Sequence, residues 1–163
     1  MYTQAYSEVG KYYNDVKKDN GNNPYSNHLR YIIDHLDTEP EKIVASFHSV
    51  LEDNIKTKSG ESIDVEMLKK WRFSDLIINS IITLTRLEGE DYNTYIDRII
   101  SSNDIIAIKV KFYALEDNLN LDRIPNPTQE DIDNILNKVK PNYEKLMKKL
   151  GELDDRYQVN KGK

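Results

Sequence analysis

The chain has 163 residues, no cysteine and a formal net charge of -5, and a single domain of this length buries roughly 70% of the surface that its unfolded chain exposes. The absence of cysteine excludes a disulfide framework and a thiolate metal site, and no apolar run approaches the roughly 20 residues that span a bilayer. Because binding to duplex nucleic acid depends on many Lys and Arg contacts, the acidic balance makes duplex nucleic acid a poor partner, and we expect a cytoplasmic protein whose candidate ligand is a small anion.

Apolar side chains recur at spacings of three and four residues along most of the chain, which is the pattern of amphipathic helices. In chain order, the pattern predicts helices over residues 3–18, 26–36, 41–51, 76–84, 92–100 and 105–121, and a last helix from about 129 to 150. Turn formers at residues 19–24 and 37–40, a polar loop at 54–63 and the prolines Pro125 and Pro127 separate these helices.

Single side chains explain several of the predicted helix ends. Ser26 and Thr128 can cap the helices that follow them, and Glu41 lies where its charge complements a helix dipole. Pro141 falls inside the last predicted helix, so we expect it to kink that helix or to divide it. Trp71 has the helical spacing of a core residue and is expected to be buried.

No alternating apolar and polar run is long enough to predict a β-strand, and no repeat of fixed period is present. The predicted fold is therefore all-α, a helical bundle of about seven helices. Residues 1–151 are expected to form a single helical domain, and residues 152–163 a polar tail that frays.

Two histidines are the first candidates for chemistry. His28 lies near the start of one predicted helix and His48 lies on the next. Imidazole is a common ligand of divalent transition metals, and helices packed side by side can bring two histidines together with carboxylates. The alternative is an ordinary histidine of the core or of a helix cap, with its ring nitrogens hydrogen-bonded.

Several short runs, taken together, are similar to one family. They are residues 24–29 (PYSNHL), 47–53 (FHSVLED), 84–86 (LTR), 90–96 (EDYNTYI), 108–111 (IKVK) and 115–119 (LEDNL). In their order and separations, over roughly residues 3–150, they resemble the HD-domain phosphohydrolases, specifically the small stand-alone relatives of the alarmone-hydrolase half of RelA/SpoT-type enzymes. The resemblance implies an all-α bundle and a His-His-Asp-Asp manganese site that hydrolyses guanosine tetraphosphate, with His28 and His48 as its two histidines.

The chain departs from this family at the two carboxylate ligands. Ser49 stands where an Asp should follow His48, and Ala114 stands where an Asp should precede Leu115. Two neutral imidazoles supply no charge to offset a dication, so we expect weak metal binding or none, with manganese the implied metal if the site works.

The resemblance gives Glu52 and Asp53 the role of generating and placing the attacking hydroxide. Without a metal, they are equally well read as the solvated end of a helix. They could also move in as replacement ligands, but a ligand cannot serve at the same time as the free general base.

Phosphate recognition uses other residues and can survive the loss of the metal. The resemblance points to Lys17 and Lys18 in the loop before Pro-Tyr, to Arg86 and Lys111 as further cations, and to Asn118 on the ribose or base side of a nucleotide. Each of these cations is also a plausible solvated surface residue, and Asn118 a plausible surface amide.

Three hypotheses follow. The first is a catalytically weak or inactive relative that binds a nucleotide or a protein partner. The second is an active manganese-dependent pyrophosphohydrolase with a non-standard metal shell. The third is a bundle whose former pocket is filled by side chains, although Ser49 and Ala114 are both small and leave space where carboxylates stood.

Overall fold

The computed structural model describes residues 24–52 and 59–158, and every regular element of that part of the chain is helical. The predicted all-α fold class is confirmed. The α-helices are α2 (Pro24–Asp34), α3 (Glu39–Phe47), α4 (Val65–Lys70), α5 (Asp75–Leu84), α6 (Tyr92–Ser101), α7 (Ile105–Asn118), α8 (Gln129–Asn134) and α9 (Lys140–Leu153). Short helical turns lie at η1 (Leu121–Arg123), η2 (Ile135–Val139) and η3 (Asp155–Tyr157). The helix predicted over residues 3–18 lies outside the described residues.

Side-chain caps account for most of the helix starts. Thr38, Asp64, Ser74, Asp91, Asp104 and Thr128 each accept a hydrogen bond from a backbone N–H in the first turn of the helix that follows. Thr128 and Asp131 form a reciprocal capping box, as the predicted cap at Thr128 requires. Helix α2 starts at Pro24, before the predicted cap Ser26, because a proline in the first turn costs no helical hydrogen bond.

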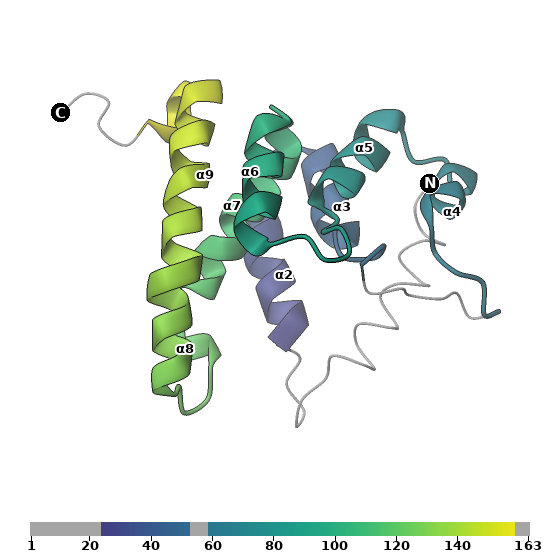
Figure 1. Cartoon of the computed structure of the whole chain (residues 1–163). Helices are drawn as coiled ribbons and strands as arrows, with labels where there is room; N and C mark the ends of the chain where they lie inside the picture. Colours follow the sequence, from purple (N-terminus) through teal and green to yellow (C-terminus); the bar gives the residue numbers. More distant parts are fainter. Residues whose placement is uncertain (1–23, 53–58, 159–163) are drawn as a thin grey trace.

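Helix α7 is the centre of the bundle. It packs against α2, α3, α5 and α9, and most of its side chains are buried, so its apolar positions surround it instead of forming one stripe. In Figure 1, α9 lies on one side of the bundle, α3, α4 and α5 lie on the other, and α6 and α7 run between them. Phe47, Leu115 and Leu146 are fully buried, and Trp71 is buried as predicted.

The last predicted helix does not run as one regular α-helix. A π-helical turn, η2, separates α8 from α9, and Pro141 lies in the first turn of α9. Pro141 has no N–H, and its ring would clash with the carbonyl group of Asn137 in a regular α-helix. The wider π-helical turn relieves both problems and rotates the side chains of η2 around the helix axis.

The end of the chain differs from the predicted frayed tail. Helix α9 continues to Leu153, and η3 returns onto the bundle, where Tyr157 and Tyr113 hydroxyls lie 3.0 Å apart. A Cβ atom at Gly151 would lie 3.3 Å from the Tyr157 carbonyl oxygen, so a glycine allows this close return. The return buries apolar surface that the polar composition of residues 152–163 does not reveal, and residues 159–163 lie outside the described part.

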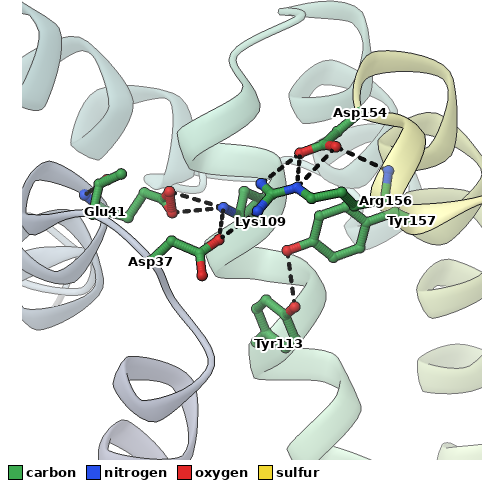
Figure 2. A network of polar contacts seen from close by, with 8 residues as sticks. Asp37, Glu41, Lys109, Tyr113, Asp154, Arg156 and Tyr157 are labelled. Atoms are coloured by element: carbon green, nitrogen blue, oxygen red, sulfur yellow. Dashed lines mark hydrogen bonds and ion pairs between the residues drawn. The ribbon is translucent and has the colours of Figure 1, made fainter.

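A network of ion pairs, buried at Lys109 and Glu41 and exposed at Arg156 and Asp37, connects α7, the start of α3 and the C-terminal turn (Figure 2). Lys109 on α7 is 3% exposed, and its Nζ donates to both carboxylate oxygens of Glu41, at 2.8 and 2.7 Å, and to Asp37 at 3.2 Å. Arg156 of η3 pairs with Asp154 and reaches Asp37 at 3.4 Å. Glu41 is therefore part of the core as well as of the first turn of α3.

None of the helices in the described residues combines the length and the apolar character needed to cross a membrane.

Candidate functional site

The first histidine of the site is held by a buried carboxylate. His28 on α2 places its Nδ1 2.6 Å from Asp117 Oδ2 at the end of α7, and Asp117, only 2% exposed, also accepts a hydrogen bond of 3.0 Å from Arg123 Nε. Because a carboxylate only accepts, Nδ1 of His28 is the donor, and in the neutral tautomer that matches this hydrogen bond the lone pair lies on Nε2. Such a partner is how proteins orient a histidine that presents Nε2 to a ligand.

The second histidine has the same arrangement. His48, immediately after α3, donates from Nδ1 to the backbone carbonyl of Ala45 at 2.6 Å. The pKa of His48 is lowered to about 4, mainly by burial. The hydrogen bond to Ala45 opposes this shift, and the charges of Lys111 and His28 add to it. At neutral pH the His48 ring is therefore uncharged, with Nε2 as an acceptor.

The residues around these histidines do not fit the manganese site that the resemblance implies. Ser49 is half-buried next to His48, and Ala114 is 4% exposed in the middle of α7. Over the described ranges, 24–52 and 59–158, no group of three or more His, Asp or Glu side chains comes together to hold a metal ion. Asp117 serves as the hydrogen-bond partner of His28, so it does not replace either missing carboxylate.

Glu52 lies at the same end of the bundle. Its carboxylate accepts a hydrogen bond from the backbone N–H of Arg86, in the loop that follows α5. The side chain of Arg86 donates from Nε to the Glu90 carbonyl oxygen at 2.8 Å, within the same loop. The structure thus brings together Glu52 and Arg86, whereas Asp53 lies outside the described residues.

Three cations gather around two tyrosine rings of α6, and we call Arg86, Lys111 and Lys138 the cation cluster. Lys111 Nζ lies 5.1 Å from the ring centre of Tyr95 and 5.7 Å from that of Tyr92. Arg86 Cζ and Lys138 Nζ lie 5.6 and 4.4 Å from the Tyr92 ring centre. Tyrosine faces attract cations, so Tyr92 holds all three positive charges in one place.

The electrostatics of the cation cluster are unusual at Lys111. Its pKa is lowered to about 8, mainly by burial. The charge of Glu52 opposes this shift, and the charges of Lys138 and Arg86 add to it. Lys111 has no hydrogen bond or ion pair with any described residue. A half-buried ammonium group without a partner is costly, so an anion that reached it would be bound favourably.

A bidentate ion pair fixes the loop that carries Arg86 and leads into α6. Arg98 donates to the two carboxylate oxygens of Glu90 at 2.8 and 2.9 Å and to the carbonyl oxygen of Thr83 at 3.0 Å. The hydrogen bonds from Arg98 hold the pKa of Glu90 down to about 2, so this carboxylate stays charged. Tyr95 also donates to the Leu84 carbonyl oxygen at 2.6 Å, which fixes α6 against α5.

The buried side-chain amide of Asn142 is hydrogen-bonded to the backbone of Lys138. Asn142 Nδ2 donates to the Lys138 carbonyl oxygen at 2.8 Å and to Asn93 Oδ1 at 3.0 Å. Its own Oδ1 is buried and has no hydrogen-bond partner within the described part of the chain. The amide therefore ties the π-helical turn that carries Lys138 to the start of α6, next to Tyr92.

The other sequence candidates are not part of this arrangement in the described structure. Asn118 lies at the end of α7 and is exposed, although it is one turn from the buried Ala114. Lys17 and Lys18 lie outside the described residues. The residues that the prediction missed are Asp117 and Lys138. Asp117 is the neighbour of Asn118 in the run LEDNL, a signal that was available, whereas no sequence pattern marks Lys138.

The low pKa of His48 predicts an acid-sensitive contribution to stability. An unfolded histidine takes up a proton near its ordinary value of 6.5, whereas folded His48 resists until about 4. The contribution of His48 to the free energy of unfolding is therefore fully present above about pH 6.5 and is lost as the pH falls toward 4. Between pH 7 and 4.5 this loss is roughly 2 to 3 kcal/mol. Urea unfolding at the two pH values should show that His48→Gln loses correspondingly less stability than the wild type.

The matched control for this prediction is His35→Gln, because His35 is exposed. It should keep the full acid sensitivity of the wild type. Equal losses in both variants would mean that His48 is not buried as an uncharged ring.

No protein-family model matches this sequence, and no curated protein matches it at a significant level.

Proposed function

We propose that this chain is a metal-independent nucleotide-binding module on an HD-like bundle, which binds the phosphates of guanosine tetraphosphate or a related nucleotide and does not hydrolyse them efficiently. The observation that carries the proposal is the cation cluster, with the half-buried and unpaired Lys111 at its centre. The guanosine part of the proposal rests on the sequence resemblance alone.

The chemistry of the cluster suits a phosphate group. Arg86 can offer planar donors and Lys111 and Lys138 can offer ammonium groups, and charge-assisted hydrogen bonds to phosphate are about twice as strong as neutral ones. The positive charge of Lys111 contributes to the lowered pKa of His48, so the cation cluster acts electrostatically on this histidine. A phosphate would supply the partner that Lys111 lacks within the described residues.

The incomplete ligand set is what separates this proposal from a hydrolase. A hydrolytic metal must hold a water molecule of lowered pKa and keep a position open for the phosphate oxygen. His28 and His48 bring no negative charge to offset a metal cation, and Ser49 and Ala114 add none. We therefore expect binding without turnover.

Calorimetric titration tests the proposal directly. Guanosine tetraphosphate should bind without added metal, and Lys111→Ala should weaken its binding roughly tenfold to a hundredfold, because a hydrogen bond to a charged group contributes about 1.5 to 3 kcal/mol. The matched control is Lys70→Ala, an exposed lysine at the end of α4, which should bind as the wild type does. Pyrophosphate as a second titrant shows whether phosphate alone is recognised.

Two results would contradict this function. The first is the failure of guanosine tetraphosphate, guanosine diphosphate and pyrophosphate all to bind. The second is rapid release of pyrophosphate from guanosine tetraphosphate by the wild-type protein with manganese.

A second candidate, an active manganese-dependent pyrophosphohydrolase, has one observation in its favour. Both histidines have their Nδ1 atoms occupied by acceptors, which leaves the Nε2 atom of each ring as the one that could contact a metal. Metal analysis of the purified protein distinguishes the candidates: bound manganese, iron or zinc favours the hydrolase, whereas an unchanged melting temperature after chelation favours the binding module.

A further inference from the structure

Two lysines that are two residues apart on α7 have opposite environments. Lys109 is enclosed by the carboxylates of Glu41 and Asp37 (Figure 2). Burial alone would lower the pKa of Lys109, but the hydrogen bonds and charge of Glu41 raise it above its usual value. Lys111 has aromatic rings and two cations as its neighbours instead, and its pKa is lowered. The same helix thus holds one lysine as a permanent cation and the other as a readily available amine.

We infer that Lys111 is a nucleophilic lysine that forms a reversible imine with small phosphorylated aldehydes or ketones. Its Nζ lies 5.1 Å from the Tyr95 ring centre. No carboxylate of the described residues lies within hydrogen-bond distance of this nitrogen. A lysine becomes nucleophilic when it is desolvated against apolar groups or placed beside other cations, and Lys111 meets both conditions.

The free amine is the species that reacts. At pH 7 a lysine of pKa about 8 has roughly 300 times more free amine than one at the ordinary value of 10.5. The lower basicity of the nitrogen offsets part of this gain. Glu52, Arg86, Lys138 and His48 are the charged or titratable groups that act on Lys111, and three of these four favour its neutral form when they are charged.

The other two members of the cation cluster suit the phosphate of the same ligand. Arg86 and Lys138 lie over the ring of Tyr92, at 5.6 and 4.4 Å from its centre, and Lys111 is directed to the same ring at 5.7 Å. This part of the inference rests on the proposed phosphate site. A ligand with a phosphate group on one end and a carbonyl group on the other would have its carbonyl carbon brought to Lys111.

The reaction needs no co-reactant beyond the two partners. The nitrogen lone pair of Lys111 attacks the carbonyl carbon, the C=O π bond breaks, and one proton moves from the nitrogen to the oxygen to give a carbinolamine. The C–O bond then breaks, the oxygen leaves as water with the second proton of the nitrogen, and the nitrogen lone pair forms the C=N bond of the imine. Addition of water reverses the sequence, so the ligand stays bound only while the imine is stable.

Pyridoxal 5'-phosphate is the probe for the experiment, with borohydride to reduce the imine by hydride transfer and make it permanent. After brief exposure of the full chain at pH 7, peptide mass analysis should find Lys111 as the main labelled residue. Lys109 should remain unlabelled, because its hydrogen bonds to Glu41 raise its pKa, and Lys70, an exposed lysine outside the cation cluster, should react at least about tenfold more slowly. The labelling rate of Lys111 should rise with pH through a midpoint near 8.

Three comparisons complete the test. Lys111→Arg keeps the positive charge and should remove the main label. Pyridoxal without its phosphate should label Lys111 at least about tenfold more slowly, the effect of losing one charge-assisted contact, and inorganic pyrophosphate should protect Lys111 from the phosphorylated probe. Lys138→Gln should slow labelling by pyridoxal 5'-phosphate but not by pyridoxal.

The inference is overturned if Lys111 reacts no faster than Lys70, or if the phosphate on the probe makes no difference. Selective labelling of Lys111 with no calorimetric binding of any guanine nucleotide would overturn the proposed function and leave the inference standing. Nucleotide binding without selective labelling would do the reverse.

Discussion

Replacing Lys109 by Met is expected to lower the free energy of unfolding by about 3 to 5 kcal/mol, the usual cost of breaking a buried ion pair on one side. The loss comes mainly from Glu41, which is 5% exposed and would keep a buried negative charge with no cation to offset it. In a domain of this size the melting temperature should fall by about 6 to 20 °C. Urea unfolding followed by circular dichroism measures the change.

The double variant Lys109→Met with Glu41→Leu is the control for this expectation. It removes both charges, and a buried pair replaced by apolar side chains of similar size is often close to neutral. Most of the stability should therefore return. If the free energy of unfolding of Lys109→Met falls by less than about 1 kcal/mol, the ion pair is hydrated in solution. The C-terminal turn is then held by its aromatic contacts instead.

Placing carboxylates at positions 49 and 114, where the resemblance implies metal ligands, should make stability depend on manganese. Ala114 is buried, so Ala114→Asp alone is expected to cost several kcal/mol in metal-free buffer, because it buries a charge without a partner. With Ser49→Asp also present, manganese would complete a shell with His28 and His48. At about 100 times its dissociation constant, the metal should return about 2.7 kcal/mol. Thermal unfolding against manganese concentration measures this recovery.

The matched control is Ser49→Asn with Ala114→Asn, which has nearly the same shape but no charge. It should be destabilised and should not respond to manganese. Release of pyrophosphate from guanosine tetraphosphate by the Asp double variant alone would support the hydrolase ancestry that the resemblance implies. If manganese does not change the melting temperature of the Asp double variant, His28 and His48 do not converge on one metal position.

Much of the fold could be predicted, because its determinants are local. The three- and four-residue spacing of apolar side chains predicted every long helix of the described part, and caps such as Thr128 marked where helices begin. The boundaries moved by a few residues, as at α2, where Pro24 extends the helix. The packed turn at residues 155–157 was missed because its polar composition gives no sign that Tyr157 returns to Tyr113.

The sequence singled out two members of the cation cluster, and their phosphate-binding role stays a prediction. Lys111 and Arg86 were expected as phosphate-binding cations, and the structure places both in the cation cluster. Lys138 was not expected, because its position depends on the π-helical turn before Pro141, and a proline signals a disturbance but not the direction of the side chains around it. Glu41 was read as a helix-dipole residue, since the chain alone does not reveal that Lys109 faces it.

By itself, the sequence determined the helical class and the order of the helices, because both depend on nearby residues, and it has Ser49 and Ala114 where the resemblance implies carboxylates. The tertiary structure decided which charges meet. Asp117 holds His28 across 89 positions of the chain, and Lys109 meets Glu41 across 68. Contacts between such distant residues follow from how helices pack around α7, and packing also decides that Lys109 is held as a cation while Lys111 is left as an available amine.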